Sequence, residues 1–115
     1  MNATNAIVAG EIAWYKSRIE DFQNSLRANR ERSADLYAQR EAIEIELVDF
    51  QDNFIQWDPQ SEEYENYLRE EADLIMKYKE IDLDIDRLRE EEVEYMKCIH
   101  YYEDELSKIE HYEIN

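Results

Sequence analysis

The stretch Trp57-Asp58-Pro59-Gln60-Ser61-Glu62-Glu63-Tyr64 decides the fold, because it separates two long hydrophobic repeats that do not share a register. Continuing the first repeat past Trp57 would place its next core position at residue 61, whereas the second repeat begins at Tyr64. Pro59 is the only proline, and proline disfavours helical geometry at the residue before it. Asp58 suits a helix N-cap, and the acids at 62, 63 and 65 suit the start of a helix. The sequence therefore predicts a turn at 58–63.

The residues before this stretch carry a heptad repeat, in which positions a and d form the seam between paired helices. With Ile12 as position a, eleven of the fourteen seam positions up to Trp57 are apolar, without a frame shift. Only a helix satisfies this spacing for so long. The a positions are Ile12, Ile19, Leu26, Ser33, Arg40, Leu47 and Phe54, and the d positions are Tyr15, Phe22, Asn29, Leu36, Ile43, Phe50 and Trp57.

The residues after the turn carry a second repeat with its own register. Twelve of its fourteen seam positions are apolar, and every d position is filled by an apolar side chain. The a positions are Tyr64, Glu71, Tyr78, Ile85, Glu92, Ile99 and Leu106, and the d positions are Tyr67, Leu74, Ile81, Leu88, Tyr95, Tyr102 and Ile109.

The two repeats predict an all-α fold, an antiparallel two-helix coiled-coil hairpin in one domain. We expect a short N-terminal segment at 1–10, a first helix at 11–57, the turn at 58–63 and a second helix at 64–115. Residues whose numbers sum to about 121 would lie opposite each other. Four polar seam residues, Asn29, Arg40, Glu71 and Glu92, are expected to set this register. The alternative is one kinked rod that pairs only between chains.

Apolar residues outside the seam predict further burial, because a two-helix hairpin buries little surface. Such widened stripes are typical of bundles, so we expect a homodimer that forms an elongated four-helix bundle. The residues concerned are Ala34, Ala38, Ala42, Ile45, Val48 and Ile55 in the first helix, and Leu68, Ile75 and Met96 in the second.

The charge composition restricts the partners. The chain has 30 acidic and 13 basic residues, a formal net charge of −17. Nucleic acids and anionic membranes would be repelled, so we expect neither, and a protein with a basic surface is the electrostatic match. Cys98 is the only cysteine and no apolar run is long enough for a signal peptide, which favours a reducing, cytoplasmic location.

The residue types that carry catalysis and metal binding do not form recognisable motifs. One glycine cannot build a phosphate-binding loop, and no Glu-x-x-His pair precedes His100 or His111. Cys98 and His100 are two residues apart and point in different directions on a helix. We therefore expect no enzyme, no metal and no cofactor.

The sequence predicts a protein that acts by binding another protein, as an adaptor, assembly factor or regulator. The alternative is an acidic inhibitor that mimics nucleic acid at a basic site, since helical carboxylates can match phosphate spacings; in composition alone the chain resembles small acidic proteins of mobile elements. Off-seam aromatic residues (Trp14, Tyr37, Tyr101 and Tyr112) suit partner contacts because Trp and Tyr are enriched at binding hot spots. The candidate partner-binding residues are Trp14, Tyr37, Ile55, Trp57, Leu68, Ile75, Asp82, Asp84, Asp86, Glu90, Glu91 and Glu94.

Overall fold

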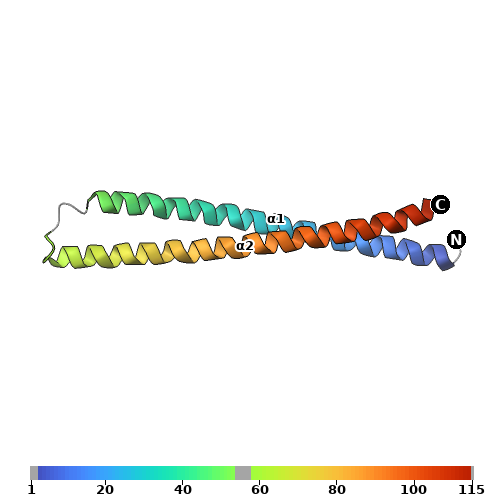
Figure 1. Cartoon of the computed structure of the whole chain (residues 1–115), viewed down its shortest axis with the longest axis horizontal. Helices are drawn as coiled ribbons and strands as arrows, with labels where there is room; N and C mark the ends of the chain where they lie inside the picture. The colour runs from blue at the N-terminus through green and yellow to red at the C-terminus, as the bar shows by residue number, and fades with distance from the viewer. Residues whose placement is uncertain (1–2, 54–57, 115) are drawn as a thin grey trace. The chain divides into compact units, whose positions relative to one another are not determined.

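The computed structural model describes residues 3–53 and 58–114 of the chain, and the side chains of residues 5–53 and 58–111. Two helices contain nearly all of these residues: α1 spans Ala3–Asp52 and α2 spans Glu62–Ile114 (Figure 1). The described residues contain no β-strand. The all-α fold that the heptad repeats predict is therefore confirmed.

The helix ends differ from the expected ones. Residues 3–10, expected as a separate segment, belong to α1, and Gly10 does not interrupt the helix because one internal glycine costs only about 1 kcal/mol. α1 ends at Asp52 rather than at residue 57, and Asn53 Nδ2 donates to the carbonyl oxygen of Asp49 at 2.9 Å. The candidate residues Ile55 and Trp57 lie outside the described residues.

The turn after Pro59 is built by local hydrogen bonds. The Ser61 amide donates to the Asp58 carbonyl at 2.9 Å, which closes a β-turn with Pro59 at its second position, where proline is favoured. The Asp58 carboxylate accepts from the Gln60 amide at 3.0 Å. Ser61 Oγ accepts from the Tyr64 amide at 3.2 Å, so Ser61 is the N-cap of α2. The prediction of Asp58 as the N-cap was wrong, because its carboxylate is used inside the turn.

The chain forms two compact units, which are described separately. The terminal unit comprises Met1–Glu31 and Arg89–Asn115, and the turn unit comprises Arg32–Leu88. In the terminal unit Arg30 Nε donates to Glu92 at 3.0 Å, and in the turn unit Tyr78 donates to Glu44 at 3.0 Å. Both pairs join α1 to α2 and their residue numbers sum to 122, close to the predicted register. The helices of one chain therefore pair antiparallel with each other, as a hairpin requires, and the kinked rod is excluded.

The core of each unit lies on the predicted seam. All twelve described seam positions of α1 and all fourteen of α2 are buried or half-buried. In the terminal unit Phe22 lies between Tyr95 and Tyr102, with ring centroids 6.2 and 5.8 Å away. In the turn unit Phe50 stacks on Tyr67 at 4.6 Å. The most buried side chains are Ile19, Asn29 and Ile99 in the terminal unit, and Tyr67, Ile85 and Leu88 in the turn unit.

Candidate functional site

A groove of about 500 Å³ follows one side of the seam in the turn unit, and carboxylates dominate its rim. Two acids of α1 and two of α2 face it, each pair spaced i, i+3 and therefore on one helix face. Lys77 is the only base of the lining, and none of the four carboxylates forms an ion pair or hydrogen bond with the described part of the chain. We call this surface the acidic groove; it is lined by Glu46, Asp49, Phe50, Asn53, Glu70, Asp73, Leu74 and Lys77.

A second groove of the turn unit, of about 490 Å³, has an apolar character. Its lining comes from heptad positions a, b and e, whereas that of the acidic groove comes from c, d and g, so the two lie on opposite sides of the seam. Val48 is 56% exposed and Ile75 is 37% exposed within it. We call this surface the apolar groove; it is lined by Glu44, Leu47, Val48, Gln51, Ile75, Tyr78 and Lys79.

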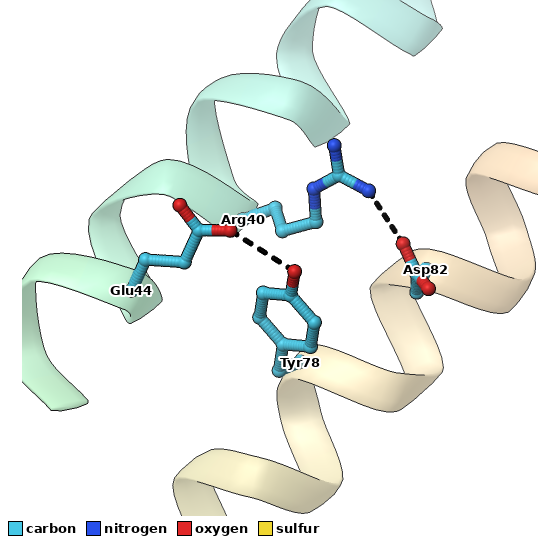
Figure 2. A network of polar contacts seen from close by, with 4 residues as sticks. All are labelled: Arg40, Glu44, Tyr78 and Asp82. Carbon is cyan, nitrogen blue, oxygen red and sulfur yellow. Dashed lines mark hydrogen bonds and ion pairs between the residues drawn. The ribbon is translucent and has the colours of Figure 1, made fainter.

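A polar network crosses the seam of the turn unit at Arg40. Figure 2 shows Arg40 and Glu44 of α1 reaching Asp82 and Tyr78 of α2. Arg40 Nη1 donates to Asp82 Oδ1, and the Tyr78 hydroxyl donates to Glu44 Oε1 at 3.0 Å. The hydrogen bond with Asp82 raises the pKa of Arg40, and the hydrogen bond with Glu44 together with desolvation raises that of Tyr78. The network thus satisfies a charge placed on the seam.

The other three residues expected to set the register are also hydrogen-bonded. In the terminal unit the buried Asn29 donates through Nδ2 to Glu91 Oε2 at 3.4 Å, and Glu92 accepts from Arg30. Both bonds link α1 to α2. Glu71, in contrast, accepts from the Tyr67 hydroxyl on its own helix at 3.0 Å. Three of the four residues expected to set the register, Asn29, Arg40 and Glu92, therefore form hydrogen bonds across the seam. The bond between Glu71 and Tyr67 stays within α2.

Several of the acids proposed as partner contacts are engaged within their own unit. Asp82 pairs with Arg40, Asp84 with Arg87 at 3.4 Å, and Glu94 with Lys97 at 3.5 Å. Glu91 accepts the hydrogen bond from Asn29, while Asp86 and Glu90 are exposed. The acids of the acidic groove were not singled out from the sequence. The signal that could have found them is the recurrence of acids at c and g on both helices near the turn.

The apolar candidates divide in a similar way. Trp14 is 53% exposed and Leu68 is 43% exposed, so both are accessible, as is Ile75 in the apolar groove. Tyr37 is half-buried, and its ring lies 4.9 Å from the guanidinium of Arg40. Its ring therefore takes part in the network of the turn unit.

Neither α1 nor α2, over their described residues, contains a stretch long and apolar enough to cross a bilayer. Among the described residues, no group of three His, Cys, Asp or Glu side chains is placed to hold a metal ion. Comparison with protein-family models, curated proteins and solved structures gives no match. The candidate surfaces for a function are the acidic groove and the apolar groove of the turn unit and the exposed ring of Trp14 in the terminal unit.

Proposed function

We propose that this chain is a non-enzymatic binding protein that recognises a basic surface of another protein. The observation that carries the proposal is the acidic groove, in which Glu46, Asp49, Glu70 and Asp73 surround a concave surface without ion pairs to the described chain. Carboxylates around an apolar floor favour cationic side chains, because the partner's charge replaces lost hydration while its aliphatic stem contacts Phe50 and Leu74.

The size of the acidic groove defines what it can hold. A volume of about 500 Å³ suits a few side chains rather than a whole domain. We therefore expect lysine or arginine side chains of the partner to enter the groove. The net charge of −17 adds a long-range attraction that accelerates the encounter with a basic protein.

The test compares two variants of equal charge in capture of partners from native host cells. The groove variant carries Glu46→Gln, Asp49→Asn, Glu70→Gln and Asp73→Asn. The control variant carries Glu20→Gln, Asp21→Asn, Glu31→Gln and Asp35→Asn, at four exposed positions of α1 outside the groove. A basic protein should be captured by the wild type and the control and lost with the groove variant. Equal capture by both variants would contradict a role for the groove.

Nucleic-acid mimicry is the second candidate, favoured by the arrangement of carboxylates in two rows from two helices. Residues spaced i, i+3 lie about 4.5 Å apart along a helix, similar to the spacing of about 3.4 Å between charges along one DNA strand. A mimic would be displaced from its target by DNA, and its affinity would fall steeply with salt. A captured partner that ignores added DNA excludes mimicry and leaves protein recognition in place.

We also propose that a second copy of the chain covers the apolar groove. Val48 and Ile75 remain 56% and 37% exposed on this side, so it keeps apolar surface that a second copy can bury. Its lining holds one acid and one base, Glu44 and Lys79, whereas that of the acidic groove holds four acids and one base, so two acidic chains repel each other less at the apolar groove.

Self-association is tested by light scattering over a range of concentrations. Val48→Asp and Ile75→Asp should each shift the dimer towards monomer, because they place a carboxylate in the buried interface. Leu83→Asp is the matched control, since Leu83 is 65% exposed and belongs to neither groove. A wild-type chain that stays monomeric at every concentration would contradict this proposal.

For the compartment, we propose the cytoplasm, where the half-buried thiol of Cys98 stays reduced.

A further inference from the structure

Four aromatic rings of the terminal unit form one connected surface cluster. Trp14 meets Tyr15 edge to face at 5.0 Å and Tyr102 at 5.8 Å, and Tyr101 meets Tyr102 at 5.3 Å. Tyr15 and Tyr102 lie on the seam and are half-buried, whereas Trp14 and Tyr101 are 53% and 59% exposed. We call these four residues the aromatic patch.

The exposed rings have surface that contacts within the unit do not use. An edge-to-face contact occupies a face of one ring and only the edge of the other. Trp14 and Tyr101 therefore retain ring surface open to solvent. Trp and Tyr are among the residue types enriched at binding hot spots, so these two rings suit a contact with a partner.

Acidic residues give the patch a preference for cations. Desolvation raises the pKa of Tyr15, and the carboxylates of Glu105 and Glu11 add to this effect. Glu105 pairs with Lys108 at 3.1 Å, whereas Glu11 has no ion pair with the described part of the chain. The charge of Glu11 adds to the negative potential of the ring faces, which attracts cations. An anionic partner would be repelled by the same groups, so the patch fits a positively charged side chain.

An arginine of the chain itself lies over Tyr102, one of the four rings of the patch. The guanidinium carbon of Arg18 lies 5.1 Å from the ring centroid of Phe22 and 5.8 Å from that of Tyr102. Arg18 Nε is buried and has no hydrogen-bond partner among the described residues. The rings of Phe22 and Tyr102 therefore contact the guanidinium of Arg18, whose Nε has no hydrogen-bond acceptor among the described residues. A planar, weakly hydrated guanidinium stacks on aromatic faces better than the compact ammonium of lysine does.

We propose that the aromatic patch binds an arginine side chain of the partner protein, with Trp14 and Tyr101 stacking on its guanidinium and Glu11 supplying the opposite charge. This inference rests on the proposed function, recognition of a basic protein. It adds a second contact point in the other unit of the chain and a preference for arginine over lysine.

The test uses an oligo-arginine peptide and an oligo-lysine peptide of equal length, titrated into the full chain by calorimetry. The wild type should bind the arginine peptide more tightly, by about two- to fivefold for each stacked guanidinium, as an exposed cation–π contact provides. Trp14→Ala and Tyr101→Ala should abolish this preference. Trp14→Phe and Tyr101→Phe should keep much of it, because they retain the rings. Circular dichroism establishes that each variant stays helical.

The controls separate this inference from the proposed function. Val93→Ala removes an exposed apolar side chain of the same unit outside the patch, and it should leave the preference intact. The groove variant should weaken both peptides equally. If the wild type binds both peptides equally, the inference fails and the proposed function stands. If it binds neither peptide, both fail. If Trp14→Ala instead dissociates a dimer of the chain, a second copy occupies the patch and the inference is overturned.

Discussion

Arg40 occupies a seam position of α1, and its guanidinium donates to the carboxylate of Asp82 on α2. Its guanidinium carbon lies 4.9 Å from the ring centroid of Tyr37 and 6.0 Å from that of Tyr78. The chain therefore places a charge where the repeat calls for an apolar residue and surrounds it with one carboxylate and two rings. We expect such a feature to specify the pairing of the two helices at the expense of stability.

The first prediction is that removing the carboxylate of Asp82 and removing the guanidinium of Arg40 have different effects on stability. Asp82→Ala leaves the guanidinium without its carboxylate and should lower the thermal midpoint by several degrees. Arg40→Leu removes the charge and fills the seam, so it should leave the midpoint unchanged or raise it. The double variant should resemble Arg40→Leu alone. Thermal denaturation followed by circular dichroism measures all three, and a stable Asp82→Ala variant would contradict the expected role of the pair.

The second prediction concerns the core of the turn unit. Ile85 is 1% exposed, so Ile85→Ala should lower the free energy of unfolding by about 2–5 kcal/mol through lost burial and the cavity left behind. Leu83, two residues earlier on α2, is 65% exposed, and Leu83→Ala should change it by no more than about 0.5 kcal/mol. Urea denaturation measures both variants. Equal effects would mean that Leu83 is covered in solution.

The third prediction concerns the start of α2. Ser61→Ala removes the hydroxyl that accepts from the Tyr64 amide and should cost about 1 kcal/mol of stability, as lost N-caps do. Ser61→Asp, which can also accept this hydrogen bond, should restore most of the loss. Ser17→Ala, at an exposed position inside α1, is the control and should not destabilise the chain. A neutral Ser61→Ala would indicate that another residue caps α2.

The fourth prediction concerns alkaline pH. Desolvation and the hydrogen bond to Glu71 raise the pKa of Tyr67, while the hydrogen bond to Glu44 and desolvation raise that of Tyr78, both from the usual 10.0. The folded state thus favours the neutral phenols. Their contribution to stability is complete below about pH 10 and is lost as the pH rises through the folded-state pKa.

Stability should therefore fall with rising pH above about pH 10, in the range where tyrosinate absorbance appears. The measurement is urea denaturation at a series of alkaline pH values, for the wild type and for Tyr78→Phe. The variant should be less stable at neutral pH, because it loses the hydrogen bond to Glu44, but should show a shallower alkaline decline. An identical pH dependence in the two proteins would contradict the role assigned to Tyr78.

The heptad repeats predicted the fold because the seam is a local property of the sequence. The same pattern predicted which side chains are buried, from Ile12 to Ile109, and the break at Pro59 located the turn. The N-cap was not predicted correctly because Asp58 and Ser61 can both cap a helix. The β-turn between them decides which one does, and this turn depends on contacts that a residue pattern does not contain.

The outward-facing acids were harder to predict than the core. A carboxylate forms an ion pair within the chain where a basic side chain lies across the seam from it. Where no base is within reach, the carboxylate faces solvent. Asp82 lies within reach of Arg40 and is engaged, whereas Glu46 and Asp73 have only Lys77 among the bases of their groove. Net charge and spacing do not separate these cases, because the difference arises from side-chain geometry.

The nearly constant sum of paired residue numbers, 120 to 122 in the polar pairs across the seam, restricts how this protein can change in length during evolution. Deleting one heptad from α1 alone would keep apolar residues on the seam, but every pair beyond the deletion, such as Arg30 with Glu92, would be offset by two helical turns. Deleting the matching heptad from α2 as well would restore these pairs. Relatives of different length should therefore differ by insertions or deletions that occur in pairs, at mirror positions about the turn.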